Sequence, residues 1–186
     1  MFEKWDIRLS GTGGQGLILG GIILASAAVK DGFNAVQSQS YGPEARGGAS
    51  KAEVIISNQE IFYPKIANAN TLLAMSQQAY DKYCVDITED ATIIIDSTLV
   101  KNIGADKAKK RFIIPITELA KKETGREMTA NIVALGAIVG ITKVVSEEAI
   151  KEAVLERIPA GTEEMNMKAL NAGMKATPEI VIHKAG

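Results

Sequence analysis

Residues 10–16, which read Ser-Gly-Thr-Gly-Gly-Gln-Gly, have the composition and spacing of an anion-binding turn. The turn follows a short apolar run and precedes a long apolar segment, so a strand, a glycine turn and a helix N-terminus are expected in succession. Glycines let the backbone approach a ligand without a Cβ in the way, and the N–H groups at a helix N-terminus attract phosphate or carboxylate. The sequence therefore predicts an anion site. The same glycines would also serve in a turn required only for close packing of the strand against the helix.

The spacing Gly11-x-Gly13-x-x-Gly16 satisfies the glycine fingerprint of dinucleotide-binding proteins. That fold also needs an acidic side chain at the end of the second strand, about 20 residues further on, to hold the ribose hydroxyls. Here the expected second strand, residues 35–40, ends without Asp or Glu. Asp31 has about the right spacing, but it lies where the first helix should end and would point away from the ligand. A nicotinamide or flavin dinucleotide is therefore not expected.

A second polar loop, residues 39–50, is longer than a simple hairpin requires. At the end of the second strand it would lie beside the glycine turn, at the edge of the sheet where open α/β folds bind ligands. The guanidinium of Arg46 suits a phosphate or a carboxylate, so Arg46 is a candidate counter-charge. A structural ion pair of Arg46 with Glu44 or Glu53 explains the residue equally well.

Short β-type runs alternate with helical patterns in the first part of the chain, which is typical of an α/β fold with a largely parallel sheet. The expected strands are residues 7–10, 35–40, 52–57, 70–75, 91–96 and 111–115, and the expected helices between them are residues 15–30 and 77–83. Further on we expect a helix over 116–123 capped near Thr117, an apolar helix over 129–142, helices opening at Ser146 and Thr162, and a strand or extended tail over 177–182. The sequence thus predicts one domain over residues 1–186, with helices flanking the sheet and a helical C-terminal third.

The composition excludes several classes of function. With 186 residues and a net charge of −1, the chain has no field or basic cluster that would attract nucleic acid. Its single cysteine, Cys84, cannot by itself hold an iron–sulfur cluster or zinc, and its single histidine, His183, is expected at the surface. We therefore expect no metal site and no catalytic residue. The most apolar run, residues 17–29, is too short to span a bilayer, and residues 1–6 lack a signal-peptide pattern, so a cytoplasmic protein is expected.

The glycine turn, the loop of residues 39–50 and the segment 52–57, taken in this order, resemble the gamma subunit of 2-oxoacid:ferredoxin oxidoreductases. The resemblance covers most of the chain and extends to Tyr63-Pro64, to residues 72–77, and to Asn166, Ala169 and Gly173. Residues 41–48, which read Tyr-Gly-Pro-Glu-Ala-Arg-Gly-Gly, are most similar to the 2-oxoglutarate branch of this family.

The resemblance implies a Rossmann-like domain in a multi-subunit enzyme that converts a 2-oxoacid and coenzyme A to an acyl-CoA and CO2, passing electrons to ferredoxin or another acceptor. Thiamine diphosphate and magnesium would lie on the alpha and beta subunits and iron–sulfur clusters on a ferredoxin-like subunit. This chain would bind no cofactor tightly. In the family the gamma domain has been linked to coenzyme A, a shared substrate. The residues that the resemblance places near its phosphates are Gly11, Gly13, Gly14, Gln15 and Gly16, with Arg46 as counter-charge.

Two other interpretations remain open. The chain could be a stand-alone reductase with a bound nucleotide, although the missing acid after the second strand and the lack of a His or Cys cluster count against this. It could also be a purely structural subunit whose glycine turn packs against a partner, because a packing turn and an anion site use the same glycines.

Overall fold

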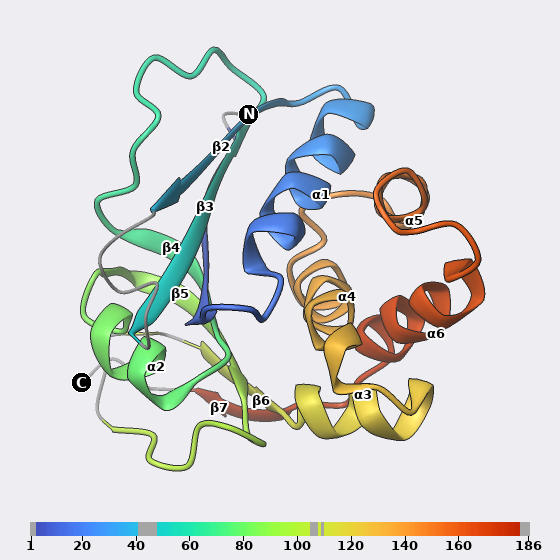
Figure 1. Ribbon diagram of the computed structural model, residues 1–186. Coiled ribbons are helices and arrows are strands. Elements are labelled where there is room, and N and C mark those ends of the chain that lie inside the picture. The colour runs from blue at the N-terminus through green and yellow to red at the C-terminus, as the bar shows by residue number, and fades with distance from the viewer. Residues whose placement is uncertain (1–2, 41–47, 105–107, 109, 183–186) are drawn as a thin grey trace.

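The computed structural model describes residues 3–40, 48–104, 108 and 110–182. Its centre is a seven-stranded sheet with the strand order β2-β3-β1-β4-β5-β6-β7 (Figure 1). The strands are β1 (Lys4–Thr12), β2 (Asn34–Ser40), β3 (Ala49–Ser57), β4 (Ala69–Ala74), β5 (Ile87–Asp96), β6 (Lys110–Ile114) and β7 (Glu179–Ile182). β1, β2, β4, β5 and β6 run in one direction, whereas β3 and β7 run against their neighbours. The predicted α/β fold with a largely parallel sheet is confirmed.

The helices cover the two faces of the sheet unequally. They are α1 (Leu17–Lys30), α2 (Gln77–Tyr83), α3 (Ile116–Thr124), the short 3₁₀ helix η2 (Glu127–Thr129), α4 (Ala130–Thr142), α5 (Glu147–Leu155) and α6 (Glu163–Met174). Figure 1 shows α1 and the C-terminal helices α3–α6 on one side of the sheet and α2 on the other. In the part of the chain that the structure describes, no helix is long and apolar enough to cross a membrane.

The inner strands β3, β4 and β5 contain continuous apolar runs because both faces of the sheet are buried there. Successive side chains of a strand point to opposite faces. On β3, Val54 and Ile56 pack in the cluster under α1 and α4, whereas Ile55 packs in the cluster around α2. On β5, Ile94 belongs to the first cluster and Ile93 to the second. This period of two fixes which residues meet which helices.

Helices α4 and α6 pack closely against each other, and glycines make this possible. A Cβ on Gly136 would lie 2.9 Å from the backbone nitrogen of Met174, and one on Gly173 would lie 2.8 Å from the backbone nitrogen of Ala137. Both added atoms would also collide with carbonyl oxygens of the facing helix. Gly173, one of the residues behind the family resemblance, therefore has a packing role.

The sequence correctly predicts the N-terminal cap of α5 but not that of α3. Ser146 caps α5, since its Oγ accepts a hydrogen bond from the Ala149 backbone N–H at 3.1 Å. The expected cap at Thr117 is wrong, because α3 begins at Ile116 and Thr117 lies inside it. Its hydroxyl donates instead to Asp96, at the end of β5, over 2.5 Å. The buried Asp96 carboxylate also accepts the backbone N–H of Thr117, so the α3 cap comes from a distant strand.

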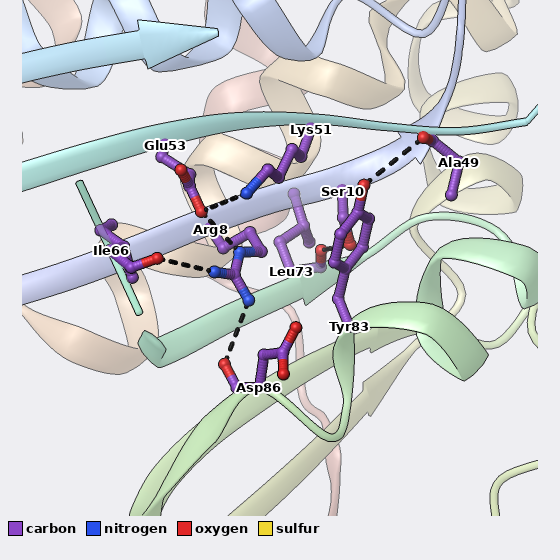
Figure 2. A network of polar contacts seen from close by, with 9 residues as sticks. All are labelled: Arg8, Ser10, Ala49, Lys51, Glu53, Ile66, Leu73, Tyr83 and Asp86. Carbon is purple, nitrogen blue, oxygen red and sulfur yellow. Dashed lines mark hydrogen bonds and ion pairs between the residues drawn. The ribbon is translucent and has the colours of Figure 1, made fainter. Parts of the chain in front are cut away.

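A buried ion pair links the centre of the sheet to two connections (Figure 2). Arg8, on β1, is 2% exposed, and its Nε donates to Glu53 Oε1 on the neighbouring β3 at 2.8 Å. Lys51 Nζ donates to the same oxygen at 2.9 Å. The Arg8 Nη1 and Nη2 donate to the carbonyls of Asp86 and Ile66 at 3.0 and 3.3 Å. Arg8 thereby holds the β3–β4 connection and the turn before β5.

Arg8→Met is expected to lower the free energy of unfolding by about 3–5 kcal/mol, because it leaves a largely buried carboxylate and two carbonyls without their main partner. Urea unfolding measures the loss. The double variant Arg8→Met/Glu53→Leu should recover most of it, since an apolar pair replaces the ion pair. A single variant as stable as the parent protein would show that the network contributes little.

Candidate anion-binding turn and adjoining cavity

The glycine turn joins the carboxyl end of β1 to the start of α1, as predicted. Gly14 and Gly16 have φ angles of 87° and 71°, in the left-handed region that favours glycine. Gly13 and Gly14 are exposed. Gly16 is the N-cap residue of α1, and among the described residues no side chain caps this helix and no acid lies in its first turn. The N-terminal N–H groups of α1 are therefore not occupied by a side chain of the described part.

Two other residues of the predicted site make contacts within the chain itself. The Gln15 side chain accepts a hydrogen bond from the Thr12 backbone N–H at 2.7 Å and donates to the Met75 carbonyl at 2.9 Å. It thus holds the turn against the end of β4. A Cβ on Gly11 would collide with the Gln15 side-chain oxygen, so Gly11 makes room for this bridge. Contact of Gln15 or Gly11 with a coenzyme stays a prediction.

The second polar loop connects β2 to β3. Its residues 41–47 lie outside the described residues, so the predicted roles of Arg46 stay predictions. The far end of the loop is placed by the register of β3, in which Ala49 pairs with Thr12. Tyr83 Oη, on α2, donates to the carbonyl of Ala49 at 3.4 Å (Figure 2). The described end of the loop therefore lies beside the glycine turn.

A cavity of about 600 Å³ adjoins the glycine turn. Gly14, Gln15 and Gly16 form part of its wall. The rest comes from α1, from the segment after β5, from the first turns of α3, α4 and α6, and from the residues just before α4 and α6. Most of this wall is apolar, and the polar side chains in it include Asn131 and Asn166. The sequence did not predict this cavity, because its wall comes from five separate segments.

Asn131 connects two of the helix starts around the cavity. Its Nδ2 donates to the Gly16 carbonyl at 3.4 Å, and a Cβ on Gly16 would lie 2.5 Å from that nitrogen. Gly16 is thus required both by its φ angle and by the side chain of Asn131. The sequence analysis missed Asn131. The available signal was a single amide side chain in the first turn of the otherwise apolar segment 130–141.

The four helix starts at the cavity differ in charge. The Asp96 carboxylate occupies the start of α3, and Glu163 lies in the first turn of α6. Hydrogen bonds from the backbone N–H groups of Glu163 itself and of Gly161 lower the pKa of the Glu163 carboxyl. The first turns of α1 and α4 hold no acid among the described residues. Glu127, just before α4, is paired with Lys121 at 3.1 Å. The N-terminal dipoles of α1, beside the glycine turn, and of α4 are therefore the least compensated of the four.

Known proteins that are similar to this chain include subunits of several oxoacid oxidoreductases. The family model described as pyruvate ferredoxin/flavodoxin oxidoreductase matches residues 6–176. The 2-oxoglutarate synthase subunit KorC of Methanocaldococcus jannaschii is 47% identical, over 94% of this chain and 95% of that protein. The ketoisovalerate oxidoreductase subunit VorA of Methanothermobacter thermautotrophicus is 33% identical, over 92% of this chain and 36% of that protein. Among solved structures, the gamma subunit of a keto/oxoacid ferredoxin oxidoreductase from Geobacter sulfurreducens has a TM-score of 0.83 and 49% identity, covering 92% of this chain and 96% of that one.

Proposed function

We propose that this chain, which belongs to the pyruvate ferredoxin/flavodoxin oxidoreductase family, is the gamma subunit of a 2-oxoglutarate:ferredoxin oxidoreductase. The observation that carries the proposal is the 47% identity to a 2-oxoglutarate synthase subunit over nearly the full length of both chains. The identity to the ketoisovalerate subunit is lower, at 33%. The family resemblance predicted from the glycine turn and the second loop is thereby confirmed, and the substrate is part of the proposal.

The complex would convert the 2-oxoacid and coenzyme A to an acyl-CoA and CO2. We assign thiamine diphosphate, magnesium and the iron–sulfur clusters to the alpha, beta and ferredoxin-like subunits. Residues 3–40, 48–104, 108 and 110–182 contain no group of three or more side chains suited to hold a metal, and Cys84 is buried. The described residues therefore do not fit an iron–sulfur cluster.

Within that complex, the glycine turn of this single domain would bind the phosphates of coenzyme A. Three features support this role: the exposed left-handed Gly14, the α1 N-terminus without an acid in its first turn, and the position at the carboxyl edge of the sheet. Arg46 is proposed as a counter-charge from the neighbouring loop. A purely structural role is the second candidate, because Gln15 and Gly11 are explained by packing alone.

Gly14→Val is expected to raise the KM for coenzyme A of the assembled complex about tenfold or more, because a branched side chain blocks backbone approach to the phosphate. Steady-state kinetics at varied coenzyme A checks this. Gly32→Val is the matched control: Gly32 has a φ of 85°, also meets no described atom within 4 Å, and lies at the opposite end of α1. Both variants carry similar backbone strain, so the control should lose similar stability and keep its KM. Equal KM values in the two variants would favour the structural role.

A further inference from the structure

Phe62 and Tyr63 form an exposed aromatic pair that neither the sheet nor the glycine turn explains. They lie in the β3–β4 connection, residues 58–68, and are 86% and 66% exposed. No two of the other exposed large hydrophobic residues in the described ranges are neighbours in the sequence. Single exposed apolar residues are normal at a protein surface, whereas an exposed apolar group of residues marks an interaction site. The aromatic pair is therefore a candidate contact for another molecule.

The connection that carries the aromatic pair is fixed to the sheet on both sides of it. Ile61 and Ile66 pack against the hydrophobic cluster around α2. Arg8 Nη2 donates a hydrogen bond to the Ile66 carbonyl at 3.3 Å, and Pro64, directly after the pair, has a restricted φ angle. The two rings are thus presented on a rigid support. A partner that binds a preorganised surface loses less conformational entropy in ordering it.

The aromatic pair lies at the edge of the sheet opposite the glycine turn. The Asn58 backbone N–H donates to the Glu3 carbonyl at 3.2 Å, so the connection begins beside the start of β1. Figure 1 shows the connection arching away from the sheet near the end of the chain marked N. The glycine turn follows the other end of β1, which spans nine residues and therefore separates the two sites by about 30 Å. A partner bound to the pair would leave the turn and the cavity accessible.

The charge of the connection indicates what kind of surface it fits. Residues 58–68 contain one acidic and one basic side chain, Glu60 and Lys65, so their net charge is zero. Long-range attraction to a charged partner is therefore not expected. Aromatic side chains are enriched at the centres of protein interfaces, where they fill apolar pockets and where a tyrosine hydroxyl finds an acceptor. The pair fits an uncharged, apolar pocket of another protein.

The lengths of the relatives indicate which protein this is. The match covers 95% of KorC but only 36% of VorA, so in VorA a unit similar to this chain is joined covalently to a longer remainder. A covalently joined unit is held at high effective concentration, whereas a separate subunit needs anchor residues of its own. We propose that the aromatic pair anchors this chain to the subunit that corresponds to the remainder of VorA. The proposal rests on the proposed function, in which the chain is a separate subunit.

The first test measures the dissociation constant of this chain for the complex that lacks it. Phe62→Ser/Tyr63→Ser should raise the constant at least about hundredfold, because two anchors are removed. Val29→Ser, at a 59% exposed position of α1, is the matched control and should keep the constant within about twofold. Fusion of the double variant to the partner subunit, in the domain order of VorA, should restore turnover. An unchanged dissociation constant in the double variant overturns the proposal.

The second test identifies the partner in the assembled complex. A photoreactive p-benzoylphenylalanine placed at Phe62 should crosslink to the subunit that corresponds to the remainder of VorA. A crosslink to a ferredoxin-like subunit or to a second copy of this chain, or no crosslink at all, overturns the proposal.

The outcomes are separate from those for the proposed function. At saturating concentrations of the double variant, the complex should keep its KM for coenzyme A, because the pair lies far from the glycine turn. A complex with the parent chain that forms no acyl-CoA from 2-oxoglutarate would refute the proposed substrate, and the crosslink would still decide the interface.

Discussion

Gly173→Ala is expected to lower the free energy of unfolding by more than about 3 kcal/mol, at the upper end of overpacking effects. The added methyl group would lie 2.8 Å from the backbone nitrogen of Ala137 and would collide with the carbonyl oxygen of Val133. Both atoms belong to the backbone of α4, so no side chain can rotate away. Relief requires that α6 move away from α4, which would open the buried interface that contains Leu170.

Urea unfolding followed by circular dichroism measures this loss. Gly20→Ala is the matched control, since Gly20 is also a buried glycine inside a helix. A Cβ there would lie 3.4 Å from the Leu9 Cδ2 atom, an ordinary contact with a side chain. Because alanine favours a helix over glycine by about 1 kcal/mol, the control should be neutral or stabilising. If Gly173→Ala proves as stable as the parent protein, then the α4–α6 crossing is looser than the structure indicates.

The sequence was sufficient for features that depend on neighbouring residues. The apolar run at residues 91–96 predicts a buried strand, and β5 contains it. The serine before the acidic residues at 147–148 predicts the cap at Ser146, which the structure has. The glycines of residues 10–16 predict the turn between β1 and α1 for the same reason. Each of these features depends on residues only a few positions apart, so the local sequence pattern is enough to predict it.

Features that depend on distant residues were not predictable. Thr117 was predicted as a cap because it stands just before Glu118. In the structure its hydroxyl is bonded to Asp96, 21 residues earlier, and a local pattern does not show that contact. The pairing of Arg8 with Glu53 depends on the antiparallel register of β1 and β3, which spans 45 residues. That β3 lies between β2 and β1 is likewise a property of the assembled sheet.

The candidate site was predictable in part for the same reason. The turn was predicted from its glycines. The cavity forms only where the starts of α3, α4 and α6 come together beside the turn, which a local sequence pattern does not show. Asn166 was noticed only through the family resemblance, whereas the hydrogen bonds that it donates to Thr162 are seen only in the structure. Arg46 lies outside the described residues, so its role rests on the sequence.

The isolated chain is expected to show no turnover of any 2-oxoacid, with or without thiamine diphosphate and coenzyme A. Its sequence lacks the Gly-Asp-Gly motif by which thiamine enzymes hold the diphosphate and its metal, and its one cysteine cannot ligate a cluster. Turnover should require the alpha and beta subunits and a cluster-bearing subunit. Addition of this chain should then restore the step that depends on coenzyme A.

Reconstitution tests the central claim most directly, with acyl-CoA formation from 2-oxoglutarate measured against reduction of ferredoxin. We expect no product from this chain alone, almost none from the other subunits without it, and full activity when it is added back. Complex reconstituted with Gly14→Val should recover activity only at raised coenzyme A concentrations. Product from the chain alone, or unchanged coenzyme A dependence in a complex that lacks the chain, would contradict the account.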